Sequence, residues 1–459
     1  MLCVPAVSLG IYSVYPHPFY DPDCTLAILI CALLLQRLEA TSSQVAFLSG
    51  LTLVIPLFVK QNTGLAFLVS ATVALFLLIA IDWRNRRPVR AYIFAICGAL
   101  IGLASALLVI QLTAGLQNYC QWTIQFAASR RMPPMSEMLA AYSDKSVLLS
   151  TLAFADGALT LWFNRTGSRA LHLLSSLLMS APFAWPAIYL LIEPDPSDRA
   201  ERLLALWPFI LIVSLVSAIV SFKRRSGTPL VLPIVLIATA HGAFLSQQLW
   251  GSTYAIWPIW IILVAGVIEA INSFSKSKTS WATIPLVGVI AVCTLIAGAA
   301  YVSSHERLDY AELTDGELAH SKLPQLRGLS MRGGWISGFE ELVDYSEREI
   351  PRDEGILMLP GEDLFYYTTG RRPRFPVLMF DRTINPYSPD EIRDLARDRD
   401  IRWLIVKQDL QLQDDQVKQF RDEVLGLLEQ DFEQVESLDN YEVYHRKTSE
   451  DENDADRLH

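Results

Sequence analysis

The hydrophobic positions of this chain form a series of long apolar runs up to about residue 302, separated by short polar segments. A helix needs about 20 apolar residues to cross a bilayer, and the runs predict a polytopic α-helical membrane domain of about ten or eleven spans. The first few runs are short, which indicates helices that are tilted, broken or covered by protein. The candidate spans are residues 1–14, 24–38, 45–59, 64–82, 91–113, 147–164, 170–192, 204–222, 229–248, 253–272 and 282–302.

The pattern changes after residue 302, where short strand-like runs alternate with helical patterns. This alternation predicts a soluble C-terminal α/β domain with a small, partly parallel sheet. We therefore expect a transmembrane domain at 1–302, the α/β domain at 303–448 and a charged, disordered tail at 449–459. The expected strands are 355–359, 376–380, 401–406 and 441–444, and the expected helices are 388–398 and 414–428.

Basic residues collect in short loops between the apolar runs, above all in segment 83–90, WRNRRPVR. Lys and Arg accumulate in the cytoplasmic loops of membrane proteins, so this segment is expected inside. Alternating the spans from it places segments 15–23, 60–63, 114–146 and 193–203 and the whole C-terminal domain outside the cell. Polar side chains in these segments would meet on one side of the membrane.

Charge and cysteine content narrow the possible partners and cofactors. The formal net charge is −10, and most Asp and Glu lie after residue 302, which argues against nucleic acid as a partner. The six cysteines include no C-x-x-C pair, so neither a zinc site nor a disulfide framework is indicated. No Gly-rich phosphate loop or nucleophile elbow is present. The sequence therefore identifies no cofactor, and it neither indicates nor excludes a bound divalent metal.

The outward segment 15–25 holds two acidic residues beside a proline. Pro22 is expected to keep Asp21 extended, and alternate side chains of an extended chain share a face. Asp21 and Asp23 would then point together into a cleft at the membrane surface. Two carboxylates there suit a general base, a metal site or contacts to sugar hydroxyls. The alternative is that Asp23 caps a helix that begins near Cys24.

Two further outward segments carry polar or basic groups. Segment 60–64, KQNTG, is a polar turn between two apolar helices, and its lysine suits a phosphate or a sugar. A snorkelling lysine in an amide-rich turn explains the same residues. The long segment 114–146 carries Trp122 and Phe126, then Arg130 and Arg131, a composition that suits a lipid phosphate. An ordinary interfacial helix needs the same composition.

Three of these features together resemble one family. Segments 20–23 (YDPD) and 60–62 (KQN), with the outward α/β domain and its run 361–376, resemble the polytopic glycosyltransferases of the GT-C class. The resemblance is to bacterial relatives of the protein mannosyltransferase and aminoarabinose transferase group, and it covers most of the chain through short motifs. By position, the resemblance implies Asp21 or Asp23 as the acidic site and Lys60 as a polar substrate contact. Taken with the outward segments described above, the candidate site residues are Asp21 and Asp23 as catalytic groups, and Tyr20, Lys60, Gln61, Asn62, Arg130 and Arg131 as substrate contacts.

This resemblance implies a multi-pass protein of the bacterial inner membrane that transfers a sugar from a polyprenyl-phosphate donor, with membrane lipids as its surroundings. Such enzymes begin with a helix and a long outer loop that bears the principal catalytic acid. The present sequence begins at what resembles their third span, so we expect that loop to be missing from it. Two alternatives remain, a non-catalytic scaffold in envelope glycan assembly and a transporter. A transporter needs ionisable groups inside spans, where Asp156, His172, His241 and Glu269 lie.

Overall fold

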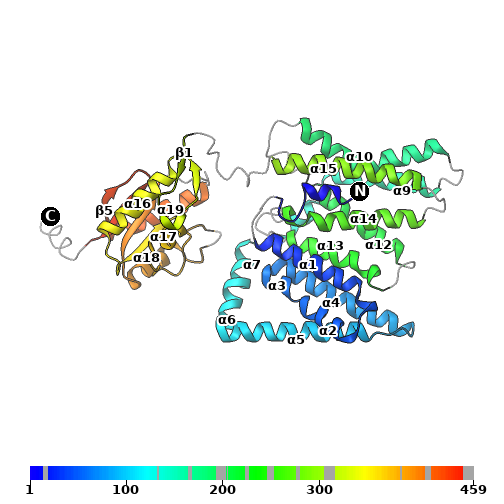
Figure 1. Cartoon of the computed structure of the whole chain (residues 1–459), viewed down its shortest axis with the longest axis horizontal. Coiled ribbons are helices and arrows are strands. Elements are labelled where there is room, and N and C mark those ends of the chain that lie inside the picture. Colours follow the sequence, from blue (N-terminus) through cyan, green and yellow to red (C-terminus); the bar gives the residue numbers. More distant parts are fainter. Residues whose placement is uncertain are drawn as a thin grey trace. The chain divides into compact units, whose positions relative to one another are not determined.

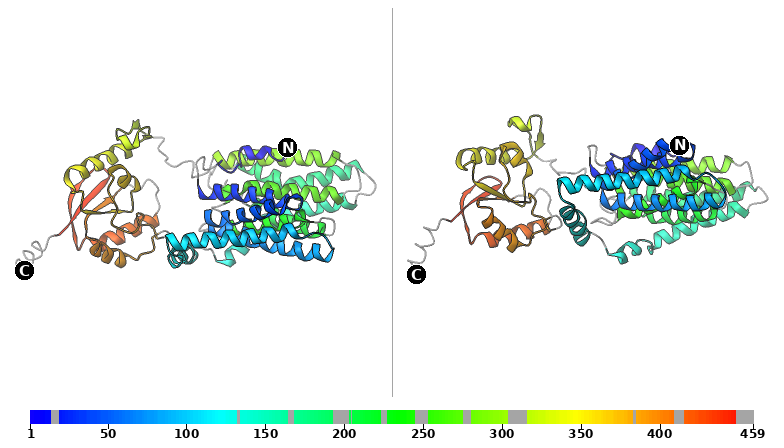
Figure 2. Two further views of the ribbon diagram at one scale, coloured as in Figure 1. Left: turned by 60° about the horizontal axis from the view of Figure 1, so that its bottom comes forward. Right: turned by 90° about the horizontal axis from the view of Figure 1, so that it is seen from below.

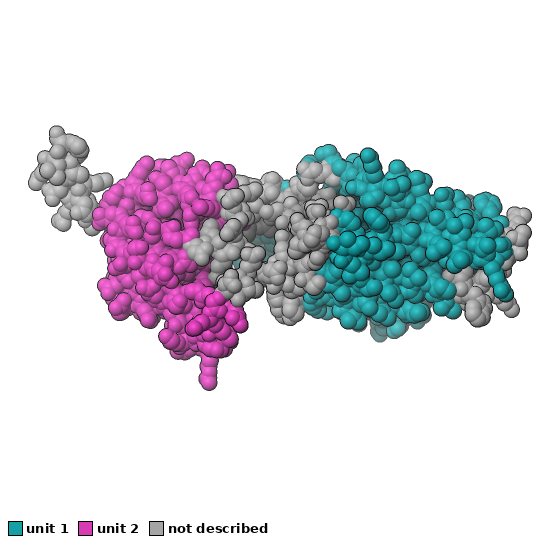
Figure 3. Space-filling view, turned by 90° about the horizontal axis from the view of Figure 1, so that it is seen from above, with its two compact units in different colours: residues 1–308 teal, residues 309–459 magenta. Residues whose placement is uncertain are grey.

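The computed structural model separates the chain into two compact units, Met1–Leu308 and Asp309–His459 (Figure 3). The first unit is helical, and the second combines helices with two small sheets. Each unit has its own buried apolar core. The structure describes residues 1–13, 19–131, 134–163, 168–192, 203, 205–222, 227–244, 253–274, 280–303, 316–382, 385–408 and 415–447.

Among the described residues, five helices are long and apolar enough to cross a membrane. The long helices of the first unit run along roughly one common direction (Figures 1 and 2). The five are α4 (Gln61–Arg84), α5 (Arg90–Thr113), α9 (Lys145–Phe163), α10 (Arg169–Ile192) and α15 (Ser280–Ser303). Shorter apolar helices complete the bundle: α1 (Tyr20–Gln36), α2 (Ser43–Thr52), α3 (Ile55–Val59), α12 (Leu206–Ser221), α13 (Thr228–Phe244) and α14 (Trp257–Phe274).

The outer surface of the bundle is apolar, as α5 illustrates. Leu100, Leu108 and Leu112 each leave more than half of their side chains exposed. Soluble proteins rarely expose apolar surface over a whole helix, whereas a bilayer covers it. The architecture is therefore compatible with a multi-pass membrane protein.

The prediction of a span at residues 1–14 is wrong. The structure has only a short 3₁₀ helix there, η1 (Val4–Val7), followed by turns. Pro5 sits at the start of η1, and the segment packs on α15 through Leu9, which is 1% exposed. The Ser8 hydroxyl donates a hydrogen bond to the Leu295 carbonyl at 3.3 Å. The apolar residues of this segment therefore serve packing against a helix.

The described residues of segment 114–146, which was expected on the outer side, form a series of short helices before α9 begins. These are α6 (Leu116–Tyr119), a π-helical turn η3 (Cys120–Gln125), α7 (Phe126–Arg131) and α8 (Met135–Ala140). Trp122 stays 43% exposed, and its ring centroid lies 6.3 Å from that of Phe126. Exposed aromatics on short helices match an interfacial segment.

The second unit is built on a four-stranded sheet with strand order β3-β4-β6-β5. Strands β3 and β4 are parallel, and the two pairings of β6 are antiparallel. The strands are β3 (Gly355–Leu359), β4 (Ile401–Lys407), β5 (Phe432–Ser437) and β6 (Tyr441–Arg446), and a separate hairpin pairs β1 (Leu318–His320) with β2 (Ser330–Arg332). The sheet is thus partly parallel, and β5 and the hairpin were not predicted.

Helices cover both faces of this sheet. Alternate residues of a strand point to opposite faces, and Leu357 and Ile356 of β3 accordingly enter two different cores. The core with Leu357 includes residues of α18 (Pro389–Asp398) and α19 (Asp415–Leu428), and the core with Ile356 includes residues of α16 (Trp335–Glu349) and α17 (Asp363–Thr369). A sheet buried on both faces explains the continuous apolar run of β3.

One expected helix start is confirmed and one expected strand is wrong. The Ser388 hydroxyl and the Glu391 carboxylate form a reciprocal capping box at the start of α18. Residues 376–380 form no strand. Phe375 and Phe380 are nevertheless buried, with ring centroids 5.4 Å apart. These residues are apolar because they fill the core beside the sheet, and the same pattern also fits a strand. The expected tail at 449–459 lies outside the described residues.

Candidate functional site

Asp21 and Lys60 form a buried ion pair at one end of the helical bundle. The Lys60 ammonium contacts Asp21 Oδ1, and the two residues are 7% and 6% exposed. The Tyr254 hydroxyl donates a hydrogen bond to Asp21 Oδ2 at 2.7 Å. Both carboxylate oxygens therefore have a partner, as a buried charge requires. Tyr20 adds an aromatic face, with the Lys60 ammonium 5.6 Å from its ring centroid.

Asp21 reaches this position because it lies in the first turn of a helix. The expectation that Pro22 keeps Asp21 extended is wrong, since α1 begins at Tyr20 and Phe19 is its extended N-cap. A proline is tolerated in the first turn, where its missing N–H has no helical partner. The positive end of the helix dipole also favours a carboxylate there. A local proline signal thus marks a helix start in this chain.

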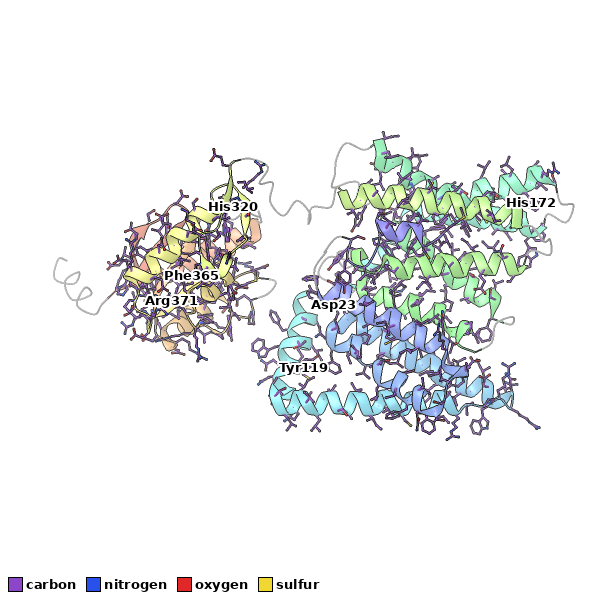
Figure 4. All side chains as sticks on the ribbon, viewed as in Figure 1. Asp23, Tyr119, His172, His320, Phe365 and Arg371 are labelled. Carbon is purple, nitrogen blue, oxygen red and sulfur yellow. The ribbon has the colours of Figure 1, made fainter. Side chains whose placement is uncertain are left out.

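Asp23 points away from Asp21 and is not part of the ion pair. Residues two apart in a helix do not face each other. Asp23 instead accepts a hydrogen bond from the Tyr12 hydroxyl at 2.6 Å. Figure 4 labels it at the beginning of α1. The expectation that both aspartates converge is therefore wrong, and so is the alternative that Asp23 caps a helix near Cys24.

Lys60 is the single residue that links α3 to α4, and its backbone is extended. The two helices approach very closely, because a Cβ at Gly64 would overlap the backbone of Pro56. This close contact directs the Lys60 side chain inward to Asp21. The ammonium is held in an ion pair and does not snorkel to the surface. Gln61 and Asn62, expected in a turn, belong to the first turn of α4.

A second polar pair, between Tyr142 and His241, lies beside the first turn of α4. The Tyr142 hydroxyl is 2.6 Å from His241 Nε2, and the two rings stack with centroids 5.9 Å apart. The other ring nitrogen, Nδ1, is 2.8 Å from the Ile237 carbonyl. The residue after the histidine, Gly242, packs on α4, where a Cβ would lie 2.9 Å from the Asn62 carbonyl. This packing places His241 close to the Lys60 end of α4.

Sequence reasoning missed Tyr254, Tyr142 and the role of His241. Tyr254 lies in a short 3₁₀ helix, η4 (Thr253–Ala255), that packs on α1, α13 and α14. No local pattern distinguishes it from other tyrosines near a membrane surface. For His241 a signal existed, because an ionisable residue followed by glycine within an apolar helix is unusual.

The other two predicted substrate contacts, Arg130 and Arg131, lie in α7. The backbone of α7 includes Arg130 and Arg131, but their side chains lie outside the described residues. In the described parts of the chain, no group of three or more His, Cys, Asp or Glu side chains is arranged to hold a metal ion. The groups brought together are thus Asp21, Lys60 and Tyr254, with Tyr142 and His241 nearby.

Such an arrangement can bind an anion or exchange a proton. Lys60 supplies a positive charge in an apolar setting, where electrostatic attraction is stronger than in water. Asp21 supplies a carboxylate that becomes a base when its lysine partner is withdrawn. A scan of protein-family models finds no match to this chain, and a search of curated proteins finds no relative.

Proposed function

We propose that this chain is a multi-pass glycosyltransferase of the GT-C type, which transfers a sugar from a polyprenyl-phosphate donor to an acceptor. The observation that carries the proposal is the Asp21–Lys60–Tyr254 cluster at one end of an apolar helical bundle. A lipid-linked sugar places its phosphate at the membrane surface with its chain in the bilayer. A buried lysine at the end of a bundle suits such a phosphate, and the adjacent carboxylate suits a base.

The proposed reaction begins with an exchange of partners at Lys60. The donor phosphate takes the place of Asp21 at the ammonium, and the freed carboxylate faces the acceptor hydroxyl. The acceptor oxygen then forms a bond to the anomeric carbon, and the bond from that carbon to the phosphate oxygen breaks. Asp21 takes the acceptor proton, and the polyprenyl phosphate leaves with the bonding electrons beside Lys60.

The location of the cluster supports an extracytoplasmic reaction. Lys60 precedes α4, and the basic segment 83–90 follows at its other end. A helix of 24 residues spans about 36 Å, enough to separate the two ends across a bilayer. By the bias of basic loops to the cytoplasm, the cluster faces outward. We place the protein in the bacterial inner membrane with its C-terminal domain outside.

The test uses native mass spectrometry of the full chain in detergent with added undecaprenyl phosphate. We expect Lys60→Met to lose the bound lipid, because no cation is left at the site. Asp21→Asn is expected to bind it more tightly than the wild type, since the phosphate no longer competes with a carboxylate. The matched control is Lys145→Met, which removes an exposed lysine at the start of α9. Equal binding in all four proteins would refute the proposal.

A second candidate function is that of a non-catalytic scaffold. It is favoured because both carboxylate oxygens of Asp21 already have partners within the protein. Asp21 uses both oxygens within the protein and joins α1, the α3–α4 junction and η4. In a scaffold this cluster serves stability alone. The double variant Asp21→Asn/Lys60→Met would then support glycan assembly in cells as well as the wild type does. A transferase would lose that activity completely.

A further inference from the structure

Two adjoining cavities lie in the bundle near the end of α1 opposite to Asp21. The first has a volume of roughly 230 Å³ between α1, α12, α13 and α14. Its lining includes Gln36, the last residue of α1, whereas Asp21 lies in the first turn of the same helix. At 1.5 Å per residue, the two positions are about 22 Å apart along the helix. The cavity is therefore separate from the proposed transfer site.

The first cavity is lined by both polar and apolar groups. Ser214 is 3% exposed, and its hydroxyl has no hydrogen-bond partner among the described residues. A buried hydroxyl without a partner costs free energy, and this one lies in the wall of the cavity. Glu269 contributes a carboxylate and Gln36 an amide to the same cavity. Gly266 leaves space there, because a Cβ on it would meet no atom within 4 Å.

The second cavity is apolar and adjoins the first. It has a volume of roughly 280 Å³ between α9, α12 and α14, and it shares Ser217 and Val267 with the first. Its lining is dominated by apolar side chains such as Phe154, Ala158 and Val213. Trp162 and Val216 line it and are 51% and 54% exposed on the outer surface of the bundle. A hydrocarbon chain can therefore enter from the bilayer.

We propose that these cavities together bind one membrane lipid with an amine headgroup, an aminophospholipid. Its acyl chain occupies the apolar cavity, and its ammonium group lies in the polar cavity against the Glu269 carboxylate. Charge decides the class of headgroup. A carboxylate attracts an ammonium and repels a headgroup that carries only a phosphate. The Gln36 amide supplies a hydrogen bond for an oxygen of the same headgroup.

This inference is independent of the transfer reaction, because it uses other residues at the other end of α1. A lipid at this position would contact α9, α12, α13 and α14 together. Interiors of proteins are close-packed, and an empty space of this size removes dispersion contacts. The bound lipid therefore also stabilises the bundle.

The test is native mass spectrometry of the full chain after transfer from vesicles of equal parts phosphatidylethanolamine and phosphatidylglycerol with identical acyl chains. We expect the wild type to retain phosphatidylethanolamine over phosphatidylglycerol by about tenfold, the gain of one charge-assisted hydrogen bond. Glu269→Gln should bring this ratio close to one. Gly266→Leu fills the cavity and should lower the retention of both lipids.

Two matched controls separate the cavity from general effects of substitution. Asp156→Asn removes another carboxylate within an apolar helix, and Asp156 lines neither cavity. Gly288→Leu adds the same side chain on α15, where a Cβ would find only ordinary contact with Met1. Both controls should retain lipid as the wild type does. An unchanged headgroup ratio in Glu269→Gln, or unchanged retention in a folded Gly266→Leu protein, would overturn the proposal.

Discussion

Each unit of this protein holds a carboxylate–lysine pair whose carboxylate also accepts a hydrogen bond from a tyrosine hydroxyl. In the helical bundle the groups are Asp21, Lys60 and Tyr254. In the α/β unit the Lys407 ammonium lies 2.9 Å from Glu362 Oε2, and the Tyr441 hydroxyl donates to the same oxygen at 3.2 Å. The lysine also lies 5.9 Å from the Trp335 ring centroid, as Lys60 lies near Tyr20.

The two clusters differ in what holds them in place. Glu362 follows β3, Lys407 ends β4 and Tyr441 begins β6, so a single sheet places all three. Tyr254, by contrast, is 233 residues from Asp21 in the sequence. The sheet pair is also more exposed, at 12% and 10% of the side chains, than the bundle pair, at 9% and 6%. The same chemistry is thus held in place by the strands of one sheet in the α/β unit and by the packing of separate helices in the bundle.

The largest effect is expected when one charge of the bundle pair is removed. Lys60→Met leaves Asp21 buried without its cation, which costs about 3–5 kcal/mol of unfolding free energy. The measurement is unfolding of the full chain in mixed micelles with increasing dodecyl sulfate. The double variant Asp21→Asn/Lys60→Met should recover much of the loss, because no charge stays unpaired. If the losses in the single variants simply add in the double variant, the two residues are not coupled.

The same substitution in the α/β unit should cost less. We expect Lys407→Met to lower the stability of that unit by about 2 kcal/mol, because water reaches the more exposed Glu362 when the lysine is removed. Pulse proteolysis of the full chain in urea, with cleavage mapped to residues 316–447, measures this loss. A cost equal to that of Lys60→Met would show that burial does not distinguish the two clusters.

An exposed ion pair in the α/β unit extends the comparison toward the surface. Arg397 donates two hydrogen bonds of 2.7 Å to the Asp431 carboxylate. These bonds hold the pKa of the Asp431 carboxyl below its usual value. A lowered carboxyl pKa contributes stability above the unfolded-state value near 4. That contribution is lost as pH falls through the folded-state value. We expect the ion pair to contribute only about 1 kcal/mol to the free energy of unfolding, since the Arg397 side chain is half exposed to solvent.

Comparing wild type with Asp431→Asn by the same urea assay isolates this pair. The wild type should be more stable at pH 6, and the difference should shrink at pH values below 4. A difference that stays constant with pH would assign the effect of the substitution to packing.

The smallest effect is expected at the start of α18. Ser388→Ala removes the hydroxyl that accepts a hydrogen bond from the Glu391 amide, and N-cap losses of this kind cost about 1 kcal/mol or less at exposed sites. The bundle should be unaffected, because the cap lies wholly within the α/β unit. Ser388→Thr is the control, since threonine caps almost as well. Equal losses in both variants would contradict a capping role.

Local patterns predicted the elements of this protein better than its site. The runs at 401–406 and 441–444 became β4 and β6, and the cap at Ser388 appeared where the sequence placed it. Long apolar helices followed from hydropathy alone. These predictions succeed because periodicity, caps and apolar length act within a few turns of chain.

At the candidate site, the sequence indicated Asp21 and Lys60 as polar residues in apolar surroundings, since ionisable groups are rare there. It did not indicate that they bind each other, that Tyr254 completes the cluster, or that Asp23 turns away. Those facts depend on where α1 begins and on the close packing of Gly64 and Gly242. Tertiary packing alone decided them, because contacts between distant segments are set by the shapes of whole helices.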